Sequence, residues 1–459
     1  MDAIEAFAQH VARTRYDDLP PLAIAAAKTF ILDTLGVGLA GSIGPRAADL
    51  VLAQRLSGVA GAEGGARVWG NGALLPAPAA ALCNAYQAHC SEFDCVHEKA
   101  VVHAMTAVLA VAMAGAERQG GVSGRDLILA SVLGVDVAAG LGLAADTGLR
   151  FFRPATAGAF GATAALGTLM GLDAGQQTHA FSLVYGQLCG TMQAHTEGSM
   201  LLALQMGFNA RNAVVACDLA AQGFEGPRQV LEGTFGYFRL IEAGGDPARV
   251  AQTLGQAWRV TELAHKPFPS GRATHGILEA CLDIRAKAEP GFDASAIAHV
   301  TAFVPPLVQH LVGRPWRADM DINTARLCAR FVAARGLLAG GLGLGDFTPE
   351  MYRDPAVAAL VARISIEVRD GGDPNALTPV EVDVVMANGE RHRSSLDTVL
   401  GNPAKPLSRA AHLDKFRANA AIASRPLSEA AQDTLIAMVD SLDDLADVRD
   451  IADLTVGED

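Results

Sequence analysis

Residues 125–145, RDLILASVLGVDVAAGLGLAA, show the pattern that decides the fold class. Leucine, valine and isoleucine are interspersed with alanine and glycine, and no proline interrupts the run. Small side chains let neighbouring helices approach closely, so this segment predicts a helix packed among others. Between residues 22 and 264 we expect a helical body without a convincing strand, because other segments share this pattern, namely residues 22–40, 78–93, 107–119, 158–170, 174–191 and 200–222.

The pattern changes after Lys266. Residues 298–304, 364–368 and 380–385 favour short strands, and Asn388-Gly389 predicts a hairpin before residues 390–393. Residues 324–338 between these strands predict a helix. After residue 402 the helical pattern returns, with a cap at Ser428 and an apolar face made of Ala431, Leu435, Met438 and Leu442.

The predicted fold is therefore mainly α with a smaller α+β domain inserted into it. Residues 1–265 form the helical domain and residues 266–402 the α+β domain. Residues 403–459 are C-terminal helices that pack back on the helical domain, so that both chain ends build it.

Charge and composition exclude several classes of partner. Half of the 459 residues are hydrophobic, which is enough for a large core, and 36 Lys and Arg stand against 49 Asp and Glu, a net charge of −13. No dense basic run is present, so we expect no nucleic-acid partner.

Localisation is predicted from the N-terminus, the apolar runs and the cysteines. The opening Met1-Asp2-Ala3-Ile4-Glu5 carries acids where a secretory signal carries Lys or Arg. The most apolar stretch, residues 101–116, is too short to span a membrane. Seven cysteines in a chain of this length do not indicate a disulfide framework. We therefore expect a cytoplasmic protein with no membrane partner.

Residues 89–103, HCSEFDCVHEKAVVH, concentrate histidines, cysteines and acids between two apolar helices. Burying such groups is costly unless they are paired or used in chemistry. If the preceding helix continues through this stretch, Asp94 and His97 share one face, and so do His89 and Glu92. A carboxylate beside an imidazole fixes its tautomer and raises its basicity, which suits a general acid or base.

Two other interpretations of this stretch remain open. Its polar residues can face water in a solvated loop. Alternatively, Cys90, Cys95, His97 and His103 can hold a metal, although Cys90 and Cys95 lack the close C-x-x-C spacing of structural zinc sites.

A second polar cluster, residues 265–275, reads HKPFPSGRATH. Its two prolines exclude a helix, so we expect a rigid loop that presents Lys266, Arg272 and His275 near the start of an Ala/Leu-rich helix. Two cations near a helix N-terminus predict a carboxylate pocket. A solvated surface linker between domains is the alternative.

The chain resembles the MmgE/PrpD family over nearly its whole length, in motifs that follow the family's order and spacing. The quoted segments are FILDTLGV at residues 30–37, HCSEFD at 89–94 with His103 downstream, AGAFGA at 157–162 with GLD at 171–173, GFEGP at 223–227, VLEG at 230–233, and KPFPS at 266–270 with Arg272 and His275.

The resemblance implies a helical domain made from both chain ends, an inserted α+β domain and a homodimer. It also implies a lyase or isomerase of small polycarboxylates that needs neither a metal nor an organic cofactor. We expect a general acid/base group from His103, or from His97 oriented by Asp94, with Glu92 as a further acid. Lys266, Arg272, His275 and His89 are the expected substrate-binding residues, with Lys266 and Arg272 neutralising the carboxylate.

Several positions depart from the family pattern. The usual first acid is Glu92, the second consecutive Asp is Cys95, and the following threonine is Val96. Histidine is absent at Phe152 and Gly271, and the K-x-[LM]-H-x-G segment has Leu202 for lysine and Gln205 for histidine. These departures predict a substrate with less charge, or another reaction of the family.

The leading hypothesis is a dehydratase-like lyase without a cofactor, acting on a small hydroxy- or unsaturated carboxylic acid. The alternatives are an epimerase of a dicarboxylate such as iminodisuccinate, a decarboxylase of the cis-aconitate type, and a carboxylate-binding protein without activity.

Overall fold

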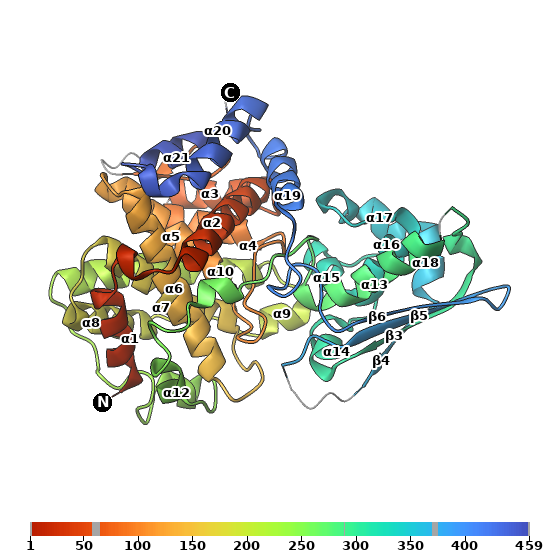
Figure 1. The fold of residues 1–459 in the computed structure, drawn as a ribbon, viewed down its shortest axis with the longest axis horizontal. Helices are drawn as coiled ribbons and strands as arrows, with labels where there is room; N and C mark the ends of the chain where they lie inside the picture. The colour runs from red at the N-terminus through yellow and green to blue at the C-terminus, as the bar shows by residue number, and fades with distance from the viewer. Residues whose placement is uncertain (1, 57–64, 289, 370–374, 458–459) are drawn as a thin grey trace. The chain divides into compact units, whose positions relative to one another are not determined.

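The computed structural model describes residues 2–56, 65–288, 290–369 and 375–457. The chain divides into two compact units (Figure 1). The helical unit comprises Met1–His195, Met200–Leu263 and Ser408–Asp459, and the α+β unit comprises Thr196–Ser199 and Ala264–Leu407. The sequence-based boundaries fall after residues 265 and 402, whereas these divisions fall after Leu263 and Leu407, and residues 196–199 were expected in the helical domain.

Long apolar helices form the core of the helical unit. They are α2 (Pro21–Gly41), α4 (Ala77–His89), α5 (Ala104–Gln119), α6 (Gly124–Ala144), α7 (Arg153–Leu169) and α10 (Leu201–Ala221). Their close packing depends on glycine where α6 crosses α7, because a Cβ added to Gly161 would lie 2.4 Å from the carbonyl oxygen of Gly134. The alanine- and glycine-rich composition therefore sets how near these helices approach.

Shorter elements complete this unit. Each of the seven predicted segments contains a helix, but α4 ends at His89 and α8 at Tyr185, earlier than predicted. The expectation of no strand needs one correction, since β1 and β2 pair as a two-residue antiparallel ladder. The remaining elements are α1 (Ala3–Arg13), α3 (Ala47–Leu56), β1 (Ala66–Arg67), β2 (Leu74–Leu75), α8 (Ala174–Tyr185), α9 (Gln193–Glu197), α11 (Tyr237–Leu240) and α12 (Pro247–Ala251).

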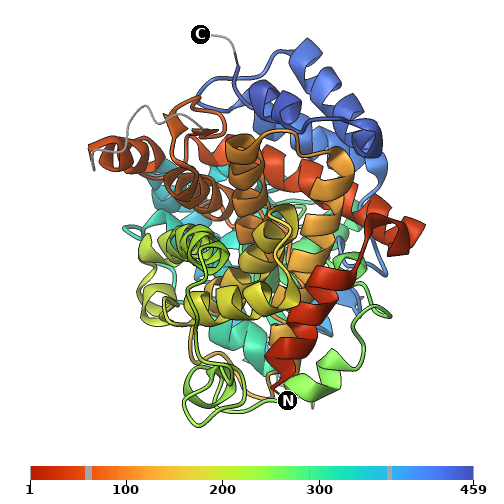
Figure 2. The same cartoon turned by 90° about the vertical axis from the view of Figure 1, so that its left-hand side faces the viewer.

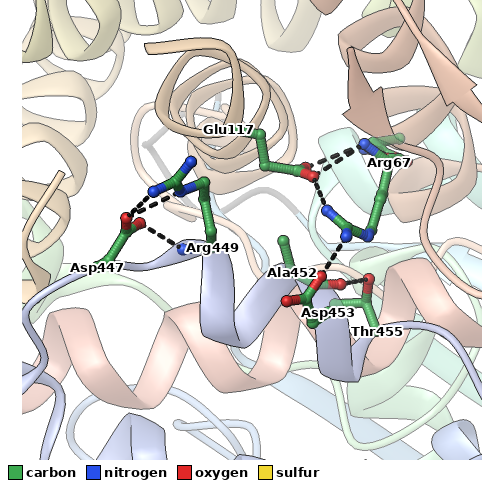
Figure 3. Close-up of polar contacts among 8 residues, drawn as sticks. Arg67, Glu117, Asp447, Arg449, Ala452, Asp453 and Thr455 are labelled. Atoms are coloured by element: carbon green, nitrogen blue, oxygen red, sulfur yellow. Dashed lines mark hydrogen bonds and ion pairs between the residues drawn. The ribbon is translucent and has the colours of Figure 1, made fainter. Parts of the chain in front are cut away.

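The C-terminal helices α19 (Arg409–Ala421), α20 (Glu429–Asp440) and α21 (Arg449–Leu454) belong to the helical unit. In Figure 2 they lie beside α2, on which α19 and α20 pack. An ion-pair network adds to this packing: Arg67, the last residue of β1, bonds to Glu117 of α5 at 2.8 Å and also to Asp453 of α21 (Figure 3). The two ends of the chain therefore build one unit.

A four-stranded sheet forms the α+β unit, with strand order β4-β3-β5-β6. Strand β3 is parallel to β4 and antiparallel to β5, and β5 and β6 form the hairpin predicted at Asn388-Gly389, where Gly389 has φ 87°. Alternate residues of β5 are buried, because α13 packs on β5 and β6. The strands are β3 (Ile297–Val304), β4 (Ile364–Val368), β5 (Val380–Met386) and β6 (Arg391–Leu396).

One prediction about the helices of this unit needs correction. The predicted helix 324–338 is interrupted at Leu327 and Cys328, giving α15 and α16. The helices are α13 (Arg272–Ala288), α14 (Pro306–Val312), α15 (Ile322–Arg326), α16 (Ala329–Ala339), α17 (Pro349–Arg353) and α18 (Pro355–Val361). The mainly α fold with a smaller α+β part is confirmed.

In the part of the chain that the structure describes, two helices are long and apolar enough to cross a membrane by length and composition alone. They are α2 and α6, and in their most apolar windows 67% and 94% of the residues are buried inside the protein. The 21-residue helix α6 corrects the sequence-based choice of residues 101–116 as the most apolar stretch. Buried core helices of soluble proteins meet the same criterion, so the absence of a membrane partner stays a prediction.

Candidate active site

The polar residues between α4 and α5 form a buried loop, residues 90–103, which we call the histidine loop. His89 is the last residue of α4, and His103 is the N-cap residue of α5. Asp94 has no exposed surface, His89 is 2% exposed and His103 is 9% exposed. Lys99 is the one exposed residue in this loop. The interpretation as a solvated loop is therefore wrong.

Asp94 is the centre of this arrangement. Its Oδ2 atom lies 2.9 Å from Nδ1 of His89 and 3.1 Å from Nδ1 of His103, and it accepts a hydrogen bond from the Thr106 hydroxyl. His103 and Thr106 lie in the first turn of α5, so the carboxylate also lies at the positive end of this helix.

These contacts determine the charge of Asp94. Burial alone raises the pKa of a carboxyl group, but the charges and hydrogen bonds of His103 and His89 outweigh it and hold the pKa of Asp94 well below its ordinary value. Asp94 is therefore an anion at neutral pH. When His103 is neutral, this anion keeps its proton on Nδ1, which leaves Nε2 as the basic nitrogen.

His89 forms one side of the same cluster. Its ring lies edge-on to that of His103, with centroids 5.0 Å apart, and 5.7 Å from the ring of Phe152 at the start of α7. Its Nε2 atom is 3.8 Å from Oε1 of Glu92. Glu92 is buried and has φ 51°, so it lies beside His89 in a non-helical backbone.

The expectation that Asp94 orients His97 is wrong, because α4 ends at His89 and the two residues do not share a helical face. Nε2 of His97 lies 2.7 Å from Oε2 of Glu262, and Nδ1 accepts a hydrogen bond from the backbone N–H of Ala100. Because Nδ1 accepts a hydrogen bond, Nε2 carries the ring proton and donates the hydrogen bond to Glu262. His97 is thus bound at both nitrogens, and its contacts close the loop.

The surroundings of Glu262 keep it ionised, which suits an acceptor of the hydrogen bond from His97. Partial burial raises its pKa, but the hydrogen bond from His97 and the nearby Arg259 outweigh this effect and lower the pKa below its ordinary value. Glu262 is therefore an anion that accepts from His97 on one oxygen and from Arg259 on the other.

Among the residues that the structure describes, His89, Asp94 and His103 also form a group that could hold a metal ion, since one ligand atom from each lies within 4.8 Å of the others. The geometry also fits hydrogen bonds centred on Asp94, in which His89 and Thr106 donate protons. The alternative set with Cys90 and His97 is not assembled, because Cys90 Sγ faces the carbonyl oxygens of Gln87 and Gly41 while His97 contacts Glu262.

In the α+β unit, the second cluster is buried as well. Lys266 and His275 have no exposed surface and Arg272 is 7% exposed, so the surface-linker interpretation is wrong. Arg272 donates from Nη1 to the carbonyl oxygens of Leu400 at 2.7 Å and His265 at 3.3 Å.

His275 is a neutral histidine in this arrangement. Its Nδ1 lies 3.3 Å from Nη1 of Arg272, which can only donate, and its Nε2 lies 3.1 Å from the carbonyl oxygen of Ser270, which can only accept. Nε2 therefore carries the proton. These contacts show Arg272 and His275 in a structural role, which the sequence-based assignment to substrate binding did not include.

Two residues of the site were not expected from the sequence. Thr106 gives no motif signal, although a threonine at the third position of α5 is placed to reach a carboxylate at the helix start. Glu262 lies 165 residues from His97, and only the fold brings them together. Phe152 was noted as a departure from a motif, but its contact with His89 was not predicted.

Comparison with known proteins identifies the family. Residues 5–250 match the MmgE/PrpD N-terminal domain, and residues 268–444 match the MmgE/PrpD C-terminal domain. The chain belongs to the MmgE/PrpD family. The suspected resemblance is thus confirmed.

Curated members of the MmgE/PrpD family align with almost the whole chain. Cis-aconitate decarboxylase from Homo sapiens is 29% identical over 99% of this chain and 94% of that protein. The Mus musculus protein of the same name is 28% identical, over 99% and 93% respectively. The cis-aconitate decarboxylase-like protein oryM from Aspergillus oryzae is 25% identical over 98% of this chain and 96% of its own length.

Proposed function

We propose that this protein is a cofactor-independent lyase, dehydratase-like, that acts on a small hydroxy- or unsaturated carboxylic acid. Membership of the MmgE/PrpD family and the curated relatives support the coarser statement, a lyase of carboxylic acids. The observation that carries the finer proposal is the buried pair of His103 and Asp94, whose nearest atoms are 3.1 Å apart.

In this proposal His103 transfers the proton that is bonded to the carbon atom next to a carboxylate. In dehydration, Nε2 takes this proton, the C–O bond breaks, and the hydroxyl group leaves with a second proton as water. Glu92, which is buried beside His89, is the proposed donor of that proton. Asp94 stabilises the imidazolium that forms on His103.

The enolate that forms next to a carboxylate carries two negative charges, so a cation is required. Lys266 is the proposed group, since a buried ammonium offers three donors and a full charge to a carboxylate. Arg272 and His275 are proposed to shape the KPFPS loop around it through their contacts with the carbonyl oxygens of Leu400 and Ser270.

The proposed substrate has less charge than a tricarboxylate. Phe152 is 6% exposed and contacts His89 through its ring, so an apolar side chain lies where the family motif has a histidine. Gln205, at a second such position, is 2% exposed and accepts a hydrogen bond from the backbone N–H of Thr191. A neutral amide and a phenyl ring favour an apolar or hydroxylated substrate group over a further carboxylate.

The test is a panel of hydroxy acids, unsaturated acids and citrate-like, malate-like and iminodicarboxylate compounds, followed by ultraviolet absorbance and proton NMR. Dehydration is expected to produce a conjugated alkene, with the best turnover for a mono- or dicarboxylate. The Lys266→Ala variant should lower kcat/KM by roughly 10–100-fold, mainly through kcat, as expected when a charged hydrogen bond to the developing enolate is lost. No turnover of any compound, together with ligand-dependent stabilisation, would instead indicate a carboxylate-binding protein.

Decarboxylation is the second candidate, and the names of the curated relatives favour it. In this reaction a C–C bond breaks, CO₂ leaves, and a protonated His103 supplies the proton to carbon. Release of labelled CO₂ from a carboxyl-labelled unsaturated acid distinguishes it from dehydration. Deuterium exchange into substrate from D₂O without an absorbance change would indicate an epimerase.

The homodimer and the cytoplasmic location stay predictions. Light scattering of the purified protein measures the first, and fractionation of the source cells measures the second.

A further inference from the structure

Two buried ion pairs flank the histidine loop, and neither contains a residue of that loop. Arg153, 1% exposed, binds Glu242 through both oxygens, with Nε to Oε1 at 2.9 Å and Nη2 to Oε2 at 2.7 Å. Lys415 of α19 binds Asp33 of α2 at 2.7 Å, and both side chains are buried.

Each cation also donates a hydrogen bond to a carbonyl oxygen of the loop. Nη1 of Arg153 donates to Ala100 at 3.2 Å, and Nζ of Lys415 donates to Phe93 at 3.0 Å. Phe93 precedes Asp94 directly, and Ala100 lies three residues before His103. The two cations therefore hold the loop on both sides of its central segment.

The backbone at these two points is strained. Glu92, next to Phe93, has φ 51°, and Val101, next to Ala100, has φ 53°. Positive φ is uncommon for residues other than glycine, and it is a genuine outlier for a β-branched valine. Such a conformation costs of order 1–3 kcal/mol and persists only where the surroundings impose it.

A gain in folding stability does not by itself explain why these two ion pairs are buried. Removing two charges from water costs several kcal/mol, and replacing a buried pair with apolar residues is often neutral or even stabilising. A fixed backbone next to a proton-transfer pair is a separate benefit, because a displacement of about 1 Å costs roughly 100-fold in rate.

We propose that the Arg153–Glu242 and Asp33–Lys415 ion pairs are positioning pairs, which hold the strained histidine loop so that Asp94 lies between His89 and His103. The catalytic consequence rests on the proposed function, whereas the geometric consequence does not. Enzyme kinetics measure the catalytic consequence, and the NMR titration of the His103 ring measures the geometric one.

The experiment replaces each pair by a neutral pair, so that no buried charge is left without its partner. The variants are R153M/E242Q and D33N/K415M in the full chain. The matched control is R67M/E117Q, which removes another ion pair between distant segments of the helical unit (Figure 3). Its Glu117 lies near the C-terminal end of α5, whereas His103 is at the N-terminal end. Melting temperature, steady-state kinetics and the NMR titration of the His103 ring are measured for all of them.

Both test variants are expected to lower kcat by about 10–100-fold with KM changed less than about threefold, because the reacting groups move while substrate contacts remain. The His103 titration midpoint is expected to shift by more than about half a pH unit, since its distance to Asp94 changes. The control should leave kcat and this midpoint as in the wild type, whatever its melting temperature.

If R153M/E242Q does not fold, R153K replaces it, because lysine keeps the charge beside Glu242 but lacks the nitrogen that reaches Ala100. If D33N/K415M does not fold, K415R replaces it and is judged by the same two readouts, because arginine keeps the charge beside Asp33 but changes the donor geometry at Phe93. A lowered kcat and a shifted midpoint in R153K support the proposal. Unchanged kcat and an unchanged midpoint, with only a lower melting temperature, overturn it for that pair. If the wild type turns over no substrate, the proposed function fails, and the His103 midpoint alone decides the positioning.

Discussion

Nδ1 of His103 lies 3.1 Å from Oδ2 of Asp94, and the carboxylate is fully buried. Because Asp94 is held as an anion, it selects the nitrogen of His103 that carries a proton and leaves Nε2 basic. This relationship makes His103 the proposed proton-transfer group, and four predictions concern it and its surroundings.

Replacing His103 with glutamine is expected to lower kcat/KM by roughly 10²–10⁴-fold, the usual contribution of one general acid/base group. The melting temperature should stay close to that of the wild type, since glutamine fills much of the same volume. His299→Gln, at an exposed position on β3, is the control and should be fully active. A fully active His103→Gln enzyme would remove His103 from the mechanism.

Asp94→Asn is expected to change how stability depends on pH. The folded-state pKa of Asp94 lies below its ordinary value of 3.8, so the ionised group stabilises the native protein above that pH. This contribution is lost as the pH falls through the folded-state pKa. The wild type should therefore lose more unfolding free energy between about pH 4 and pH 2 than the variant does, by about 1 kcal/mol or more.

Urea unfolding at several pH values measures the Asp94 effect. Asp146→Asn is the control, since Asp146 is exposed, and its pH profile should follow the wild type. Parallel profiles for wild type and Asp94→Asn would show that Asp94 titrates alike in the folded and unfolded states.

Thr106→Val is expected to destabilise the protein by about 1–3 kcal/mol and to lower kcat, because it removes a hydrogen bond to a buried carboxylate without changing the shape of the side chain. Thr106→Ser keeps the hydroxyl group and should restore most of kcat. Thermal unfolding and kinetics on both variants measure this. Equal kcat values for valine and serine would mean that the hydroxyl group does not act on Asp94.

Metal removal is expected to leave activity unchanged. The cluster of His89, Asp94 and His103 could hold an ion, but here its hydrogen bonds converge on Asp94. Dialysis against a chelator, followed by elemental analysis and assay, measures this. Loss of activity that returns with one divalent ion would replace the acid/base proposal with a metal site.

The sequence predicted much of the fold, because helix and strand patterns are local. Asn388-Gly389 predicted the β5–β6 hairpin, and every predicted helical segment of the first 222 residues contains a helix. Where helices end was less predictable. Helix α4 ends at His89, and the left-handed backbone at Glu92 turns the chain away from a helical path, which changed which residues share a face.

The sequence identified several residues of the site, but not which residues contact each other. The concentration of histidines and acids at residues 89–103 identified His89, Asp94 and His103. The partner of His97 was assigned wrongly, because helical spacing suggested Asp94 while the folded chain supplies Glu262. Arg272 and His275 were expected to face a substrate, yet they also bond to backbone carbonyls and to each other.

The amino-acid sequence by itself determined the helical class, the inserted sheet and the family, because periodicity and motif spacing are properties of neighbouring residues. Only the tertiary structure decided which groups meet: that Asp94 accepts from His89 and Thr106, that Glu262 binds His97, and that Lys415 reaches the loop from the other end of the chain. The reason is physical. A buried charge must find partners within about 3 Å, and distant segments supply them only once the helices have packed.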